Sequence, residues 1–423
     1  MTELVALLHQ GRVLITPAGT LPELPPLRDG ADERSLAEVL ALVGAEIPIA
    51  PTAKLADGRL VHLVGMRDAD PPPATAGADL APPAAVADAE LAQVLQRALD
   101  ELDPAHTPAQ RPDWFRPGWF DLLEAWIDAA LAPTGRRRAG PVEPFRLWSI
   151  SAVVRVPTDD GVLWCKAPCP YFRTEARIHS AVARLLPDLV PDLVATEPDE
   201  GWLLMRPMTG ADDPAPGAAL EVARCWASAQ LASIERVPAL LAAGLQPRGV
   251  DETIAAFEAL LRDSGELVLL SDDELREARA AAGPAIELVR RFWAAGIPDA
   301  LAHGDLHLGN VAWDGADLRI FDWTDGCISH PFLDASHLVR FVDDATGADA
   351  LRSYADAWRD VYPDVDVDTV VALAPLADLV FQTVTFDELA KATEPQSAWE
   401  LGGVIARNLR ALPQLVARST DPR

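Results

Sequence analysis

The sequence predicts an α+β protein in three successive parts: a small α/β region, a small antiparallel β-sheet and a long helical region. Three observations support this prediction. β-branched and aromatic residues form two runs around a turn between residues 146 and 167. Apolar residues recur at helical spacing through most of residues 217–423. A short hairpin pattern, flanked by polar residues, interrupts the helices after residue 310.

The first part, residues 1–105, is expected to be a separate small α/β domain. Residues 9–11 form the turn of a predicted hairpin, and Asp32 is the expected N-cap of the first helix. The pattern predicts two hairpin strands at residues 4–8 and 12–16, and then a helix that follows Asp32 and contains Leu36, Val39, Leu40 and Val43. A third strand at residues 60–64, a loose loop rich in proline and alanine at residues 71–83 and a second helix at residues 90–102 are expected next.

For residues 106–140 the sequence predicts a tryptophan-rich linker that contains a helix over residues 121–131. Its aromatic cluster could line a ligand site, but such a cluster beside a domain boundary more often packs one domain onto the next. The basic triplet at residues 136–138 could attract phosphate, and a solvated linker is the simpler interpretation. The aromatic residues concerned are Trp114, Phe115, Trp119 and Trp126.

Residues 141–210 predict a small antiparallel sheet. Strands are expected over residues 146–156 and 162–167, with Lys166 near the end of the second. Glu175 lies nine residues later, on the apolar side of a predicted helix. Ser149 and Ser151 lie in the turn between the first strands, where backbone amides and hydroxyls can donate to phosphate oxygens. Residues 201–208 predict the last strand, which runs past Met205.

The most informative stretch is His-Gly-Asp-Leu-His-Leu-Gly-Asn, residues 303–310. Asp305 and Asn310 are five residues apart, which is the interval between catalytic Asp and metal-binding Asn in kinase catalytic loops. Two apolar runs around an Asp-Gly turn then predict a hairpin. Asn310 enters the first strand and Asp322 leaves the second, so the open end of the hairpin brings them side by side. Two oxygen ligands of this kind suit Mg²⁺, which is usually completed by phosphates and water.

This segment resembles the signature of the aminoglycoside phosphotransferase family, the small-molecule branch of the protein-kinase-like fold. The resemblance rests on the 303–310 loop, on Phe-Asp-Trp at residues 321–323 and on Asp334 about a dozen residues further on. It covers roughly residues 141–423 and is densest between residues 301 and 334. It implies a bilobal fold, with a small antiparallel β N-lobe at residues 141–210 and a helical C-lobe at residues 211–423.

The resemblance also implies roles for individual residues. The cofactors are expected to be ATP and Mg²⁺, with Asn310 and Asp322 as metal ligands. Asp305 would accept or orient the proton of a substrate hydroxyl, and His303 and Asp334 would support the loop. Around the nucleotide, Lys166 would contact the phosphates and Glu175 would hold that lysine, while Ser149, Ser151 and the hinge backbone near Met205 would complete the nucleotide site. The sequence lacks G-x-G-x-x-G, which fits a family whose phosphate loops are often poor in glycine.

The helical region is expected to contain helices before and after the catalytic hairpin, over residues 219–234, 251–261, 273–295, 351–361, 370–384 and 397–416. Carboxylates that could bind an aminated acceptor are found on these helices. The candidates are Asp378, Asp387 and Glu388, although each could equally be a solvated helix charge.

Composition limits the other possibilities. The formal net charge of −28 argues against nucleic-acid binding, which needs a basic surface. No run of eighteen uncharged apolar residues is present, so no membrane span is expected. The start of the sequence lacks a signal-peptide pattern, and the four cysteines show no C-x-x-C pair. A cytoplasmic location is therefore expected.

Two alternatives to an active small-molecule kinase stay open on the sequence. One is a nucleotide-binding pseudokinase or regulatory protein. The other is a scaffold whose N-terminal region recruits a protein partner. That region is faintly similar to a Nudix domain in the order of its elements, but it has only Glu33 and Glu38 where a run of metal-binding glutamates is needed. The resemblance would imply a degenerate, non-catalytic module.

Overall fold

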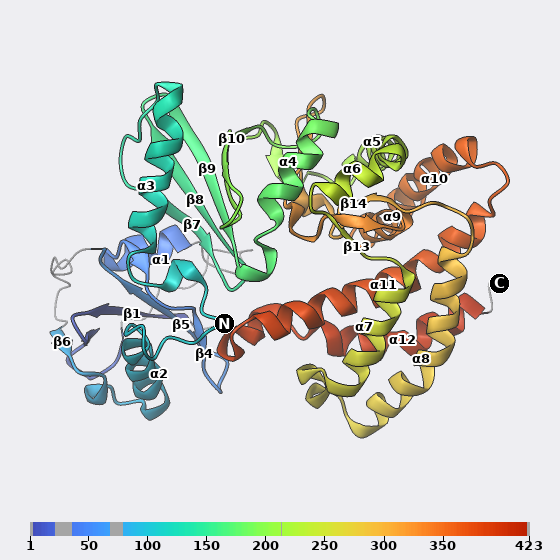
Figure 1. The fold of residues 1–423 in the computed structure, drawn as a ribbon. Helices are drawn as coiled ribbons and strands as arrows, with labels where there is room; N and C mark the ends of the chain where they lie inside the picture. Colours follow the sequence, from blue (N-terminus) through green and yellow to red (C-terminus); the bar gives the residue numbers. More distant parts are fainter. Residues whose placement is uncertain (1–2, 22–35, 68–78, 213, 421–423) are drawn as a thin grey trace. The chain divides into compact units, whose positions relative to one another are not determined.

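A computed structural model describes residues 3–21, 36–67, 79–212 and 214–420. The chain forms two compact units. Unit 1 contains Met1–Tyr171, Trp202–Met205 and Ala390–Gly402, and unit 2 contains Phe172–Gly201, Arg206–Leu389 and Gly403–Arg423. Sheets dominate the first and helices the second, which confirms the α+β class with a β lobe and a helical lobe (Figure 1). The predicted boundaries at residues 105, 140 and 210 stay predictions.

The N-terminal part of unit 1 is a mixed sheet with one helix on each face. Its strands run in the order β3-β5-β1-β2-β6, with β4 paired to β5. Strands β1 and β5 are parallel, and the other pairs are antiparallel. The bounds are β1 Glu3–His9, β2 Arg12–Ile15, α1 Leu36–Val43, β3 Ile47–Pro48, β4 Ala53–Lys54, β5 Leu60–Gly65, β6 Asp79–Ala81 and α2 Ala89–Asp100.

Alternation along β1 explains this layering, because successive side chains of a strand point to opposite faces. Leu4, Ala6 and Leu8 pack in one apolar cluster with Leu91 and Leu95 of α2. The intervening residues face the other way. They pack in a second cluster with α1, formed by Val5 and Leu7 with Val39, Leu40 and Val43.

The structure corrects the end of the loop expected over residues 71–83, of which residues 71–78 lie outside the described residues. Residues 79–81 form β6, which pairs with β2, and Pro83–Ala85 form a short 3-10 helix. Proline- and alanine-rich composition favours a loop, but pairing with an available sheet edge outweighs that preference. Asp32 and Glu33 lie outside the described residues.

The rest of unit 1 is an antiparallel sheet with helix α3, Trp119–Leu131, packed on it. Four strands of this unit run in the order β11-β9-β8-β7, with bounds Trp202–Met205, Gly161–Pro168, Ser151–Thr158 and Glu143–Leu147. Trp119 and Trp126 of α3 both meet the ring of Trp202 edge-on. These two tryptophans therefore join α3 to the sheet within unit 1.

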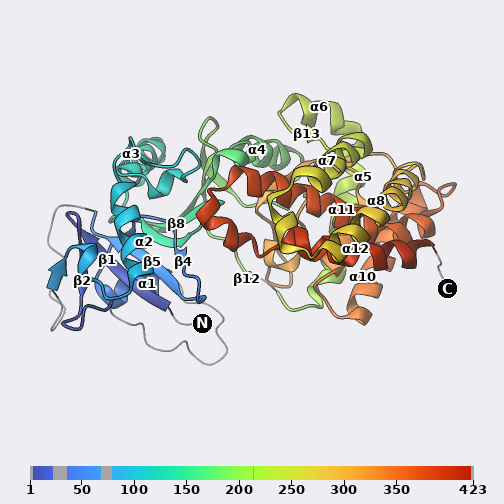
Figure 2. The ribbon, with the colours of Figure 1, turned by 90° about the horizontal axis from the view of Figure 1, so that it is seen from below.

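Unit 2 contains two groups of helices and two small three-stranded sheets (Figures 1 and 2). The helices are α4 Glu175–Leu185, α5 Ala218–Ser233, α6 Val237–Ala242, α7 Val250–Asp263, α8 Asp272–Trp293, α9 Phe332–Val339, α10 Asp344–Val361, α11 Val367–Ala392 (to Leu389 in this unit) and α12 Val404–Thr420. The strands are β10 Leu193–Glu197, β12 Ala211–Asp212, β13 Gln246–Pro247, β14 Ala300–Ala302, β15 Val311–Trp313, β16 Leu318–Ile320 and β17 Cys327–Ser329.

The bounds of α10, α11 and α12 differ from the sequence-based expectation. Helix α10 begins at Asp344 rather than 351, because the Asp343 carboxylate caps it by accepting the Thr346 amide. Helix α12 begins at Val404 rather than 397. Gly402 and Gly403 both adopt positive φ, 66° and 64°, which is incompatible with a right-handed helix through these two residues. Helix α11 is longer than the expected 370–384.

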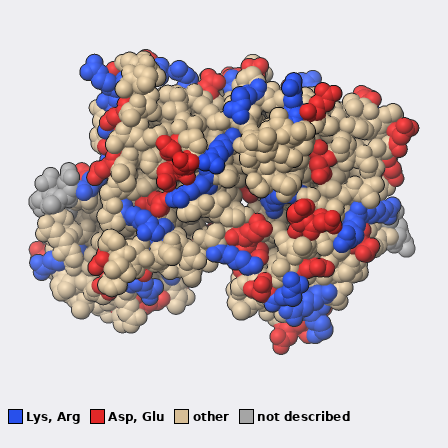
Figure 3. All heavy atoms as spheres, viewed as in Figure 1, with Lys and Arg blue, Asp and Glu red and all other residues tan. Residues whose placement is uncertain are grey.

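Helix α11 is long and apolar enough to cross a membrane, with a mean hydropathy of 1.6 over its best window. That window is 72% buried inside the protein, which is the property of a core helix. On the face shown in Figure 3, basic and acidic side chains are interspersed.

Candidate active site

The catalytic-loop sequence lies in unit 2, between β14 and the β15–β16 hairpin. The hairpin forms as the sequence predicts, with Val311 opposite Ile320 and Trp313 opposite Leu318. At its open end the Phe321 amide donates to the Asn310 carbonyl at 3.0 Å. Asn310 and Asp322 therefore stand at adjacent strand ends. The Asn310 side-chain amide donates back to the Asp305 carbonyl at 2.9 Å, which closes the loop.

Asp322 adopts a left-handed backbone conformation with φ of 65°. An L-residue other than glycine or asparagine is uncommon in this region, and such strain gathers at functional sites. The turn that follows is short, and the Thr324 hydroxyl donates to Asp322 Oδ1 at 2.8 Å. This backbone conformation changes the direction of the chain, and with it that of the Asp322 side chain, directly after β16.

Asp334, on α9, holds the start of the catalytic loop. Its carboxylate accepts the backbone amides of His303 at 2.8 Å and Gly304 at 2.9 Å. It also accepts the Trp226 indole at 2.9 Å and the Gln230 amide at 3.1 Å. The side chain is 1% exposed. Burial raises the pKa of Asp334, while these hydrogen bonds and His303 work to lower it.

His303 is fully buried behind the metal-ligand segment. Its Nε2 lies 2.9 Å from the Phe321 carbonyl, and its ring packs on Trp323. Burial lowers the pKa of His303. A neutral ring that donates from Nε2 leaves Nδ1 to accept the Asp305 amide at 3.4 Å. His303 thus links the catalytic loop to the residue before Asp322.

Asp305 is anchored by side chains on both of its carboxylate oxygens. His337 Nε2 lies 3.0 Å from Oδ1, and Oδ2 lies 3.3 Å from the Asn310 amide and 3.6 Å from His307 Nε2. The side chain is still 37% exposed, so a substrate can reach it. Burial would raise the pKa of Asp305, but its contacts with His307 and His337 lower that pKa far below the ordinary carboxyl value.

Helix α11 supplies two contacts that the sequence analysis missed. Gln382 donates to the Gly304 carbonyl at 2.7 Å, and Asp378 bonds His337. Asp378 is buried, so it is neither a solvated helix charge nor an open carboxylate for an amine. The spacing of residues 378 and 382, one helical turn, could have indicated a shared face, and His337 lies one turn after Asp334.

The predicted nucleotide residues are divided between the units. Lys166 on β9 is buried, opposite Leu203 of β11 and Val153 of β8. Met205 ends β11. Glu175 begins α4 in unit 2 and is also buried. Since Lys166 and Glu175 belong to different units, the expected ion pair between them stays a prediction.

The turn expected to cover phosphate is held by other parts of unit 1. The Ser149 amide donates to Glu400 Oε2 at 2.8 Å. The Ser151 hydroxyl accepts the Trp148 indole at 2.9 Å, and the Trp114 indole donates to the Trp148 carbonyl at 3.0 Å. A phosphate oxygen can bind the Ser149 amide only when Glu400 leaves it.

The donor set suits magnesium rather than a metal held by protein alone. Among the described residues, no group of three or more His, Cys, Asp and Glu side chains is placed to hold a metal ion. Asn310 and Asp322 offer one amide oxygen and one carboxylate from neighbouring strand ends. Mg²⁺ is commonly bound by one or two carboxylates together with substrate phosphates and water, so these residues fit the cation.

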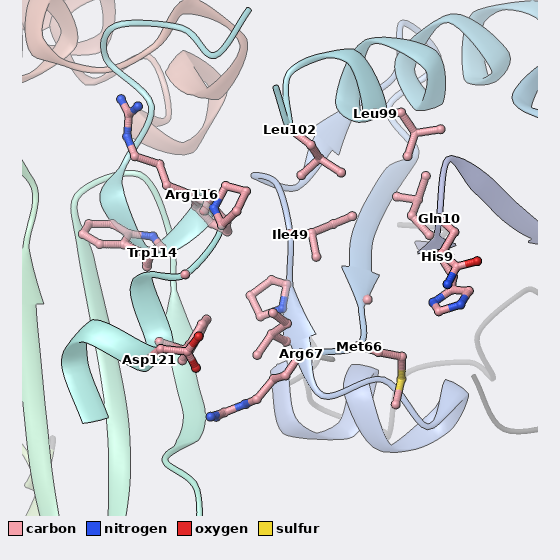
Figure 4. Close-up of a pocket in the computed structure, with 18 of the residues that line it drawn as sticks. His9, Gln10, Ile49, Met66, Arg67, Leu99, Leu102, Trp114, Arg116 and Asp121 are labelled. Carbon is pink, nitrogen blue, oxygen red and sulfur yellow. The ribbon is translucent and has the colours of Figure 1, made fainter. Parts of the chain in front are cut away.

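Unit 1 also contains a cavity of about 270 Å³, lined by Trp114 and Phe115 of the aromatic cluster but by none of the residues predicted for the nucleotide, the metal or catalysis. It lies where the parallel strands β1 and β5 end, near His9 and Arg67, and beside the first turn of α3 (Figure 4). Ile49, Leu99 and Phe120 contribute to its apolar wall. Arg67 is already paired with Glu124 at 2.5 Å.

The β lobe, the helical lobe and the loop clamped by Asp334 match the class of protein-kinase-like phosphotransferases. The chain belongs to the phosphotransferase enzyme family, whose model (APH) matches residues 150–367. No curated protein matches the chain.

Solved structures similar to this chain share its fold at low sequence identity. A variant of aminoglycoside 2'-phosphotransferase-IIIa, solved with GDP, has 16% identity and a TM-score of 0.52 over 71% of this chain and 99% of its own. Spectinomycin phosphotransferase APH(9)-Ia, solved with ADP and spectinomycin, has 11% identity and a TM-score of 0.50 over 70% of this chain and 98% of its own.

Proposed function

We propose that this protein transfers the terminal phosphoryl group of ATP to a hydroxyl group of a small molecule. The observation that carries the proposal is the joint placement of Asp305, Asn310 and Asp322 around one loop whose backbone Asp334 clamps. Such a loop supplies an acceptor for the hydroxyl proton beside two metal-binding oxygens.

The chain's own residues would act mainly by positioning. Asp305 would orient the acceptor hydroxyl and take its hydrogen bond. Asn310 and Asp322 would hold Mg²⁺, which neutralises charge on the phosphates when it is bound. In a largely dissociative phosphoryl transfer, a weak base suffices, and the low pKa of Asp305 is compatible with that role.

On the nucleotide side, Lys166 would contact the phosphates and Glu175 would orient that lysine. Ser149 and Ser151 would approach the phosphates, and backbone near Met205 would bond the base. The solved relatives contain GDP in one case and ADP in another. Both ATP and GTP therefore belong in the assay.

The acceptor is proposed to be an aminoglycoside, an amino sugar or a related metabolite. Support comes from family membership and from the small molecules in two solved complexes, kanamycin in that of APH(2")-IIIa and spectinomycin in that of APH(9)-Ia. Asp378 is engaged by His337, so a cationic acceptor would need other carboxylates.

The test is nucleotide consumption by the purified protein with Mg²⁺ against aminoglycosides, macrolides, amino sugars, sugars and amino alcohols. We expect turnover that depends on one acceptor class and falls about a thousandfold in Asp305→Ala, with nucleotide affinity retained. Asp360→Asn, which removes one exposed carboxylate from α10, is the matched control.

Magnesium binding provides a second measurement. Asp322→Ala should weaken Mg²⁺-dependent nucleotide binding without unfolding unit 2. Tight nucleotide binding with no turnover on any acceptor would instead favour a regulatory protein. If neither nucleotide binds, the proposal fails.

A further inference from the structure

His337 lies between two carboxylates, one of which is Asp305. Its Nε2 is 3.0 Å from Asp305 Oδ1, and its Nδ1 is 3.1 Å from Asp378 Oδ1. A neutral imidazole has a single N–H, whereas an imidazolium donates from both nitrogens. Two carboxylate partners at these distances are satisfied together only by the charged ring.

The surroundings of His337 favour this charged state. The ring is 5% exposed and Asp378 is 3% exposed. Besides the two carboxylates, it faces His307 and Phe341, with ring centroids 6.2 Å and 5.6 Å away. Arg340 Nη1 lies 3.9 Å from Asp378 Oδ2. Burial lowers the pKa of His337, but Asp378 and Asp305 outweigh it and raise the pKa to about 10.

The three residues come from separate elements of unit 2. Asp305 follows β14, His337 is on α9 and Asp378 is on α11. Asp334, on the same helix as His337, clamps the backbone of the loop that carries Asp305. Helix α9 thus fixes both the backbone and the carboxylate of the catalytic segment.

We infer that His337, kept charged by Asp378, is the positioning residue that orients the Asp305 carboxylate; this inference rests on the proposed phosphotransfer. Its bond anchors Oδ1, which leaves Oδ2 to meet the acceptor hydroxyl. Oδ2 has only longer contacts, at 3.3 Å and 3.6 Å. Because the imidazolium already carries both protons, it cannot accept the hydroxyl proton, so His337 orients the base and does not relay protons.

The decisive variant is Asp378→Asn, which keeps the shape of the side chain but removes the charge that keeps His337 protonated. In this variant the pKa of His337 should fall into the neutral range. As the pH rises from about 6 to about 9 and His337 loses its proton, we expect kcat of the variant to fall to about a tenth of the wild-type value. The KM for nucleotide should change little. Asp360→Asn should keep the wild-type profile.

His337→Gln complements that test. Glutamine can still donate one hydrogen bond but carries no charge. We expect kcat to fall about tenfold throughout this pH range, without a new limb in the profile. A wild-type pH profile in Asp378→Asn would overturn the inference, as would wild-type kcat in His337→Gln.

A measurement without substrate separates this inference from the proposed function. In ¹⁵N NMR of the nucleotide-free protein, the His337 ring signal is identified as the one that disappears in His337→Gln. In the wild-type protein this signal should remain that of an imidazolium from about pH 6 to about pH 9. In Asp378→Asn it should titrate within that range. A neutral His337 ring in the wild type overturns the inference even if turnover depends on Asp305. An imidazolium that titrates only in the variant supports the charge pairing even if no acceptor is found.

Discussion

Different kinds of side chain are buried in the catalytic segment, residues 301–334, and in the N-terminal region, residues 1–105. In the catalytic segment, buried polar side chains converge on the backbone of a single loop. Asp334 alone accepts four hydrogen bonds there. In the N-terminal region, two apolar clusters fill the space between the sheet and its helices, and the ion pairs of Arg59 with Asp57 and Asp88 lie nearer the surface.

This difference has an energetic meaning. Burying polar groups costs free energy unless each finds a partner, so a satisfied network mainly fixes geometry. Apolar burial stabilises a fold but places few groups precisely. The catalytic segment is therefore built to hold donors and acceptors in position, and the N-terminal region is built to hold a compact fold. Variants in the two regions should fail in different ways.

The largest expected effect is that of Asp334→Ala. Its loss would leave the amides of His303 and Gly304 and the Trp226 indole buried without an acceptor. We expect the free energy of unfolding of unit 2 to fall by about 4 kcal/mol, and turnover to be lost. Urea unfolding followed by circular dichroism measures the first quantity. Asp360→Asn is the control, and a loss smaller than about 1 kcal/mol would contradict the clamp.

A smaller effect is expected from Arg111→Met in unit 1. Arg111 donates to both carboxylate oxygens of Glu394 at 3.0 Å and pairs with Glu101. Glu394 is 0% exposed, so the variant would leave a buried carboxylate without its cation. We expect a loss of about 3 kcal/mol, most of it recovered when Glu394→Leu is added. Equal losses in the single and double variants, by thermal unfolding, would contradict the pairing.

The comparison also shows which features can be predicted from sequence. The loop at residues 303–310 and the β15–β16 hairpin depend on short-range spacing and turn residues, so their sequence predicts them. The parallel pairing of β1 with β5 joins residues more than fifty positions apart and has no local signal. The start of α10 was predictable from the Asp343 cap, and the start of α12 from the two glycines before it.

Side-chain networks are less predictable than the elements that carry them. Lys166, Glu175, Asp305 and Asp322 could be selected because their residue types recur at known intervals. Helical spacing could place Gln382 on the face of Asp378 and His337 one turn after Asp334, but it could not show that they contact the loop, because that depends on how α9 and α11 pack. Asp378 was selected because its carboxylate could bind an aminated acceptor, but in the folded protein it is packed against His337 instead.

The smallest expected effect concerns Asp325, whose backbone closely approaches Gly304. Gly304 adopts φ of 85°, and a Cβ there would lie 2.5 Å from the Asp325 carbonyl. Burial, reinforced by the nearby Asp305 carboxylate, raises the pKa of Asp325 to about 7. An unfolded aspartate titrates near pH ~3.9. Between these values the folded protein binds a proton that the unfolded chain has lost.

The raised pKa of Asp325 therefore contributes stability that is fully present below about pH 4 and is lost as the pH rises through about 7. Asparagine has no such titration, so Asp325→Asn should make the free energy of unfolding of unit 2 less dependent on pH in this range. Because Asp325 is partly exposed, we expect the variant to be more stable than wild type at about pH 8 by on the order of 2 kcal/mol. Urea unfolding at a series of pH values, without Mg²⁺, measures this gain. Parallel curves for the two proteins would mean that Asp325 is ionised at an ordinary pKa. A gain in the stability of wild type over the variant as the pH rises from about 2 to about 4 would mean that the carboxylate stabilises the loop as an anion, as Asp305 is expected to do beside His337.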